Sequence, residues 1–169
     1  SCSDISEQKK SELALQRSEE RISKLYNETP IMMHSIDRNG IIEDVNDFWL
    51  SSLGFERSEI VGKSGLTHLT DESRKRAVEI NLPNFFKDGH CREIPYQVIK
   101  KSGEIIDVLL SAESELDSEG NVIKSEARMI DVTEQNRHEK LLIIKEALLK
   151  NSEEKFRLLF ESAADPIFI

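Results

Sequence analysis

The sequence predicts an α+β fold made of two strands, a helical insert, three further strands and a closing helix. Apolar and polar residues alternate in short runs through the middle of the chain, as they do in half-buried strands. All seven glycines lie between residues 29 and 133, whereas residues 1–28 and 134–160 contain neither glycine nor proline. The 169 residues therefore provide one globular domain of ordinary size, flanked by two long helices.

The first two strands form a predicted hairpin. Apolar runs at 31–36 and 41–45 flank the dipeptide Asn39-Gly40. An Asn-Gly pair supplies the positive φ that a tight hairpin turn needs, so the two strands are expected to be antiparallel.

A helical insert follows this hairpin. Residues 46–53 predict a helix that ends at Gly54, which suits the position just after a helix. A short turn is expected at 58–62. Asp71 is then a suitable N-cap for a longer helix over residues 72–86.

Alternation returns after the insert and predicts three more strands. The apolar positions of the first two are Ile94, Tyr96 and Val98, then Ile106, Val108, Leu110 and Ala112. Turns are expected at Lys101-Ser102-Gly103 and at 117–120, and the last strand is expected over 122–132.

The flanking segments, 1–28 and 134–160, predict long exposed helices with charges of both signs. Apolar residues recur mainly at intervals of seven, which is typical of a coiled coil that joins two chains. The predicted dimer seam consists of Leu15, Ile22 and Leu25, and of Leu142, Leu149 and Phe156. The alternative is that each helix is amphipathic and lies on its own domain.

An internal repeat links the two flanking segments. Residues 18–26 resemble residues 152–160, and each copy is followed by a proline and an apolar run. Residues 161–169 are therefore expected to begin a second domain of the same kind, with ends that are poorly placed without the rest of it. The chain would then be a piece of a longer protein.

Composition excludes several classes of function. A net charge of −9 with no basic cluster argues against binding to nucleic acid. Cys2 and Cys91 lie far apart without metal-ligand spacing, which predicts no metal site and favours a reducing, cytoplasmic location. No apolar run is long enough to cross a membrane, although an anchor elsewhere in a longer protein stays possible. No phosphate loop, nucleophile elbow or zinc-protease motif occurs, so this segment is not expected to be an enzyme.

Two side chains are candidates for contact with a ligand. His34 shares its strand face with Met32 and Ile36, so it either lines a cavity or is a core histidine bonded to a neighbour. Trp49 either stacks on a flat ligand or fills the core. The junction at Asp131, Thr133 and Glu134 is a good helix start, and it could also pass a distortion of the sheet to the helix.

Several of these motifs together resemble the PAS sensor domain over about residues 25–133. The motifs are Asp37-Arg38-Asn39-Gly40-Ile41-Ile42, Val45-Asn46, Leu53-Gly54-Phe55, Glu59-Ile60-Val61-Gly62-Lys63, Lys101-Ser102-Gly103-Glu104 and Asp131-Val132-Thr133. The resemblance implies a five-stranded antiparallel sheet with helices on one face and a pocket between them. It also implies a homodimer formed through the flanking helices, and coupling of the sheet to the output helix by Asp131 and Thr133.

The resemblance suggests a sensory module of a bacterial signal-transduction protein, of the sensor histidine kinase or GGDEF/EAL type. Its partners would be a second copy of the chain and the neighbouring PAS and output domains. The expected pocket residues are Met32, His34, Ile36, Trp49, Leu53, Phe86, Tyr96, Val98, Val108, Leu110, Ala127 and Met129. In the alternative, the domain binds nothing, and packed side chains close the cleft of a dimerisation spacer.

The cofactor stays open. The light-sensing flavin subfamily has a reactive cysteine in the insert, and haem-binding members have a histidine in the long insert helix. Neither occurs at the matching positions here, which disfavours cysteinyl-flavin chemistry and haem. Noncovalent flavin, a small metabolite or no ligand are the remaining possibilities.

Overall fold

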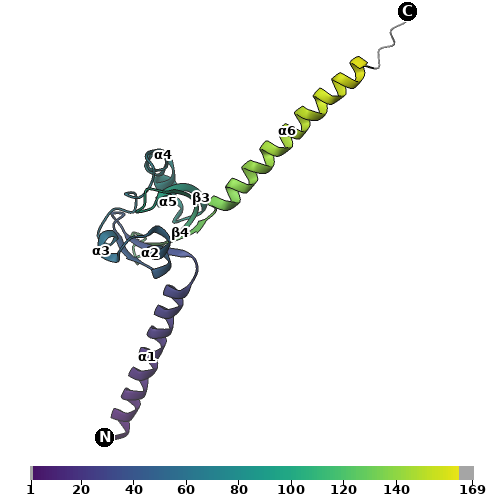
Figure 1. Cartoon of the computed structure of the whole chain (residues 1–169). Coiled ribbons are helices and arrows are strands. Elements are labelled where there is room, and N and C mark those ends of the chain that lie inside the picture. Colours follow the sequence, from purple (N-terminus) through teal and green to yellow (C-terminus); the bar gives the residue numbers. More distant parts are fainter. Residues whose placement is uncertain (1, 164–169) are drawn as a thin grey trace, which may run out of the picture. The chain divides into compact units, whose positions relative to one another are not determined.

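Five antiparallel strands form a single sheet in the spatial order β2-β1-β5-β4-β3. The structure, a computed structural model, describes residues 2–163. The chain divides into two units, Ser1–Asp131 and Val132–Ile169 (Figure 1). The strands are β1 Met32–Asp37, β2 Ile42–Val45, β3 His90–Ile99, β4 Ile105–Leu116 and β5 Val122–Asp131. The helices are α1 Cys2–Glu28, α2 Asp47–Leu53, α3 Arg57–Ile60, α4 Asp71–Arg76, the π-helix η1 Ala77–Asn81, α5 Leu82–Asp88 and α6 Thr133–Ala163.

The strand order places the helical insert across the sheet. The strand before the insert, β2, lies at one edge, and the strand after it, β3, lies at the other. The insert therefore has to pass over the sheet from edge to edge, where its apolar side chains pack against one face. This arrangement confirms the predicted α+β fold with five antiparallel strands and a helical insert on one face.

Three hairpin connections share one turn geometry. The N–H of the glycine at each turn donates to a carbonyl three residues earlier: Gly40 to Asp37 at 3.0 Å, Gly103 to Lys100 at 2.9 Å and Gly120 to Asp117 at 3.1 Å. In the first turn, Oδ1 of Asp37 also accepts from the N–H groups of Asn39 and Ile41. Of the expected pair Asn39-Gly40, only Gly40 adopts a positive φ, at +77°. The loop is therefore a three-residue turn that ends in a left-handed glycine.

Replacing Gly40 or Gly120 with alanine is expected to lower the free energy of unfolding by about 1 kcal/mol in each case. Both glycines have φ above +70°, and an added Cβ would meet no described atom within 4 Å, so the cost is purely conformational. Urea denaturation of the two variants measures it. Gly65→Ala is the control, because its φ lies outside the positive region and its Cβ would make an ordinary 3.5 Å contact with Ile36. A larger loss for Gly65→Ala than for both turn variants would contradict this account.

The prediction of one long insert helix over residues 72–86 is wrong. The segment is divided into α4, the five-residue π-helix η1 and α5, and its N-cap is Thr70 instead of Asp71. The physical reason is Pro83, which has no N–H to donate and whose ring would clash with the carbonyl of Glu79 in a regular α-helix. A wider turn just before the proline relieves this clash.

The core lies between the sheet and the insert. Side chains less than 2% exposed come from both layers: Met32, Val45, Leu53, Ile60, Ile106 and Val108. Helix α2 begins after Asn46, whose side chain accepts from the N–H of Trp49, and ends at Gly54 with φ +80°, as predicted. This short helix brings the only tryptophan of the chain into the core at 3% exposure.

The two long helices bury none of their residues. The six residues of the predicted seam are between 46% and 70% exposed: Leu15, Ile22, Leu25, Leu142, Leu149 and Phe156. Helix α1 therefore does not lie with this seam against the sheet of its own unit. The apolar run predicted to open a second domain, at 166–169, lies outside the described residues. No helix within residues 2–163 is long and apolar enough to cross a membrane.

Candidate functional site

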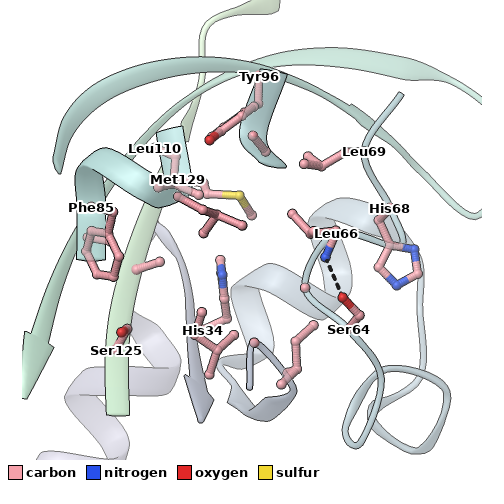
Figure 2. A pocket seen from close by; sticks show the side chains of 18 of the residues that line it. His34, Ser64, Leu66, His68, Leu69, Phe85, Tyr96, Leu110, Ser125 and Met129 are labelled. Atoms are coloured by element: carbon pink, nitrogen blue, oxygen red, sulfur yellow. Dashed lines mark hydrogen bonds between the residues drawn. The ribbon is translucent and has the colours of Figure 1, made fainter. Parts of the chain in front are cut away.

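A cavity of about 350 Å³ lies between the inner face of the sheet and the insert. Its sheet wall comes from all five strands, with Ile42 contributed by β2, and its opposite wall comes from α2, η1, α5 and the loop at 64–69. Figure 2 shows His34, Ser125 and Met129 from the sheet, Phe85 from α5, and Ser64, Leu66 and His68 from the loop around this space. Protein interiors seldom leave so large a void, so its origin needs an explanation.

Small side chains on the sheet create the cavity. The strand register places His34 beside Ala127, and Ala127 beside Ala112, in one row across three strands. Ile36 is paired with Ser125 in the next row. Alanine and serine project too little volume to reach the insert, so the space above them stays open, whereas the neighbouring row with Met32 and Met129 is filled.

His34 brings an imidazole ring to the wall of this space. Its ring projects from β1 into the cavity (Figure 2). The Nδ1 atom is buried and has no hydrogen-bond partner among the described residues. Burial lowers the pKa of His34 to about 4, so the imidazole is neutral at physiological pH. A neutral imidazole offers one donor and one acceptor, which makes it a recognition group and not a fixed charge.

Two more buried nitrogens lack a partner within the described part of the chain: Nε1 of Trp49 and Nε2 of His68. Both residues line the cavity, and their rings meet edge to face with centroids 6.1 Å apart. The ring of Phe55 packs against the imidazole of His68, with ring centroids 4.6 Å apart. Burial lowers the pKa of His68 as well, so this ring is also uncharged. An indole N–H can only donate, and thus it lacks an acceptor.

Trp49 is fixed through Asn46, which is fully buried. The Asn46 side-chain oxygen accepts from the backbone N–H groups of Met33 at 2.9 Å and Trp49 at 3.0 Å. Its amide nitrogen donates to the carbonyls of Tyr26 and Ile31, both at 2.9 Å. One side chain thus joins the end of α1, the start of β1 and the helix that carries Trp49.

Three other polar side chains around the cavity are already bonded, those of Tyr96, Ser64 and Asp37. Oη of Tyr96 accepts from the amide of Asn81 at 2.9 Å, and burial raises the pKa of this tyrosine. Oγ of Ser64 accepts from the N–H of Leu66 at 3.3 Å (Figure 2). Hydrogen bonds from backbone N–H groups lower the pKa of Asp37 and keep its carboxylate in the turn. Arg38 is the one basic lysine or arginine in the lining of this cavity as described, and it is exposed.

The structure brings nine of the twelve predicted pocket residues to the cavity wall: His34, Ile36, Trp49, Phe86, Tyr96, Val98, Leu110, Ala127 and Met129. The other three, Met32, Leu53 and Val108, are at most 1% exposed and belong to the filled core. Contact of the nine with a ligand stays a prediction.

The prediction missed several lining residues. The loop residues Ser64, Leu66 and His68 gave no signal, because loops have no periodicity. Ala112 and Ser125 did carry a signal, since they are small residues at inward-facing positions of their strands. Cys91 also lines the cavity, and burial raises the pKa of its thiol, which disfavours a reactive thiolate.

The predicted relay residues lie at the boundary of two elements. Asp131 is the last residue of β5, and Thr133 is the first residue of α6. Glu134 lies in the first turn of α6, where it bonds to Arg137 at 2.8 Å. The N–H of Asn136 donates to the carbonyl of Val132, so Val132, and not Thr133, directly precedes the helix. A single residue therefore separates strand from helix.

A search for groups of three or more histidine, cysteine, aspartate or glutamate side chains that could hold a metal finds none within residues 2–163. The two cysteines are free thiols, with Cys2 exposed and Cys91 partly buried.

Comparison with protein families and solved structures agrees with this geometry. A family model described as PAS domain matches residues 28–134, more than half of the chain. No curated protein sequence matches.

Three solved structures show the likeness of the fold. The PAS domain of an HTR-like protein from Haloarcula marismortui is 21% identical over 73% of this chain and 98% of its own, with a TM-score of 0.63. A sensory box histidine kinase/response regulator from Burkholderia thailandensis is 16% identical over 78% of this chain and 98% of its own, with a TM-score of 0.61. The PAS domain of a LuxR-family transcriptional regulator from the same organism, in complex with ethanol, is 17% identical over 64% of this chain and 95% of its own, with a TM-score of 0.55.

Proposed function

The chain belongs to the PAS domain family, and from this we propose that its cavity binds a small ligand whose presence is passed to the flanking helices. PAS domains are sensory modules and not enzymes. The observation that carries the proposal is the cavity itself, a space of about 350 Å³ between the sheet and the insert. Protein interiors seldom keep so large a void, so a ligand would fill it. A similar PAS domain that holds ethanol supports this use of the fold.

The flanking helices are the proposed route of the signal and the proposed dimer contact. Leu142, Leu149 and Phe156 of α6 are exposed at intervals of seven, and the related positions of α1 are exposed as well. Apolar residues at this spacing pack against a second copy in a coiled coil. The output domain would belong to the same longer chain, as a histidine kinase or a cyclic-dinucleotide enzyme.

Native mass spectrometry with an absorption scan of the freshly purified protein tests binding and dimerisation together. We expect the mass of a dimer with an additional small molecule. A protein that carries nothing, and that binds no member of a broad metabolite library, would overturn ligand sensing and favour a spacer that only relays signals. The mass of a monomer would overturn the predicted dimer seam.

The relay is proposed to pass through Asp131 and Thr133. A ligand that favours one geometry of the sheet would shift the population of α6 arrangements, because one residue joins strand to helix. Such coupling is typically worth about 1–3 kcal/mol, or roughly 5–150-fold. In the full-length protein, Asp131→Ala and Thr133→Ala are therefore expected to reduce the response to ligand at least about fivefold with ligand affinity unchanged.

The matched control for the relay is Glu126→Ala, an exposed position on the same strand. Output activity and ligand affinity are measured for each variant. If the two junction variants respond to ligand as Glu126→Ala does, the relay does not pass through this junction.

A further inference from the structure

We infer that Arg74 is a latch that holds closed a strap in the wall of the cavity. The strap is residues 62–70, which lie between α3 and α4 and supply one wall of this space. In Figure 2, Ser64, Leu66 and Leu69 of the strap lie along one side of the cavity. The inference rests on the proposed function for its use in sensing, and it names the part of the wall that opens and the residue that keeps it closed.

Both ends of the strap are bonded to the sheet. Strands β2 and β3 are the opposite edges of the sheet, and the strap bonds to the β1–β2 hairpin at its first end and to β3 at its second. The anchoring backbone hydrogen bonds are Gly62 N–H to Ile42 O at 2.8 Å, Ile42 N–H to Lys63 O at 2.8 Å, Gly65 N–H to Gly40 O at 2.9 Å, Ile99 N–H to His68 O at 2.7 Å and Thr70 N–H to Gln97 O at 3.1 Å. The strap therefore spans the insert face of the sheet from one edge to the other.

The middle of the strap depends on Arg74, which lies on α4. The guanidinium of Arg74 donates to the carbonyls of Leu66 at 3.2 Å and Thr67 at 3.4 Å, and also to that of Leu69 at 3.1 Å. Within residues 2–163, no other hydrogen bond joins residues 66 and 67 to a group outside the strap. Arginine suits this position because its planar guanidinium presents several donors in a rigid fork.

The strap costs less to open than the sheet wall. The strands of that wall are bonded to their neighbours along their length, so moving one of them breaks many hydrogen bonds at once. Lifting the middle of the strap breaks the three bonds from Arg74, whose side chain is 44% exposed, so water replaces part of what is lost. The lining beside the strap already reaches the surface at Arg38 and Asn39, so a lifted strap would widen this opening.

Trp49 reports whether the strap is open. It is the only tryptophan of the chain and is 3% exposed, so a quencher in the solvent reaches it poorly. The imidazole of His68, which belongs to the strap, lies edge to face against the indole. When the strap lifts, His68 leaves the indole, and a small neutral quencher such as acrylamide can reach the ring.

Removal of the latch tests the inference. Arg74→Met keeps an unbranched apolar side chain but removes every donor. We expect the amide hydrogens of Thr67 and Leu69 to exchange at least about tenfold faster, as followed by NMR, since one hydrogen bond from a charged group is worth roughly that factor. Acrylamide is expected to quench the fluorescence of Trp49 at least about twofold faster, because other openings of the fold contribute to quenching as well.

Two further variants are the controls. Arg57→Met is matched to Arg74→Met, because Arg57 is 43% exposed and bonds to Asp44 and Asp47, which lie outside the strap. It is expected to leave both rates unchanged. Arg74→Lys keeps the charge but offers one nitrogen in place of the fork, so its rates are expected to lie between those of the unmodified protein and Arg74→Met.

Unchanged rates in Arg74→Met would overturn the latch, and unmodified rates in Arg74→Lys would show that charge alone holds the strap. The N–H of Asn46, which donates to Met33 outside the strap, reports general loss of stability. Equally faster exchange at Asn46 in Arg74→Met would overturn a role confined to the strap. The experiment needs no ligand, so its failure leaves sensing in place, whereas a working latch in a protein that binds nothing would overturn sensing alone.

Discussion

Replacing Asn46 with alanine is expected to lower the free energy of unfolding by about 3–5 kcal/mol. The residue is 0% exposed and makes four hydrogen bonds, all to backbone groups. Alanine would leave two N–H groups and two carbonyls without this partner, and each buried unsatisfied group costs about 1–3 kcal/mol. Partial entry of water would lessen the sum, so the expected loss is below the simple total.

The measurement is urea unfolding of the purified variant against the unmodified protein. Asn39→Ala is the matched control, because Asn39 carries the same side chain on an exposed turn and makes only a local contact with Asp37. Its expected cost is below about 1 kcal/mol. Equal losses for the two variants would show that the buried hydrogen bonds of Asn46 do not hold this junction together.

Acidification from about pH 7.5 to pH 5 is expected to destabilise the domain by roughly 2 kcal/mol through His34 alone. The folded-state pKa of His34 is about 4 and its ordinary value is 6.5, because burial disfavours the imidazolium. Between these pH values the unfolded chain binds a proton that the folded chain does not, so stability is lost as the pH falls. His68 acts in the same direction, since burial also lowers its pKa.

The pH range isolates the histidines. The pKa values of Asp37, Glu59 and Asp117 are lowered, mainly by hydrogen bonds from backbone N–H groups. The ordinary pKa values are about 3.9 for aspartate and 4.3 for glutamate, so these carboxylates are mostly ionised above pH 5 in both the folded and the unfolded chain and contribute only a small slope there.

His34→Leu is expected to remove most of the loss of stability between pH 7.5 and 5, as measured by urea unfolding at several pH values. The control is His138→Leu, which replaces an exposed histidine of α6. This variant is expected to lose as much stability between pH 7.5 and 5 as the unmodified protein. If His34→Leu keeps the full slope, His34 is not the group that titrates on unfolding.

Local sequence signals were sufficient for the sheet and for helix α2. Alternation and turn signals identified the five strands, and Gly54 marked the end of α2, because a left-handed glycine acts over a few residues. The long insert helix was predicted from Asp71 as its cap, and a cap does not show that Pro83 divides the helix, which the backbone accommodates by a π-helix.

The cavity was only partly predictable. Strand parity identified His34, Ile36 and Ala127, but it could not separate them from Met32 and Val108, which share the same face of the sheet. That separation depends on where the insert packs, which is a tertiary property. The loop at 64–69 has no pattern at all, so its contribution to the wall appears only in the folded molecule.

Two layers of the fold supply the wall of the cavity. Its capacity is set by the short side chains of Ala112 and Ala127, which lie inside the hydrogen-bond ladder of the sheet, whereas the indole donor lies on the insert. A longer side chain at either alanine would reduce the volume of the cavity from the sheet side without changing Trp49. The volume of the cavity can therefore be changed by single substitutions in the sheet on one otherwise unchanged scaffold.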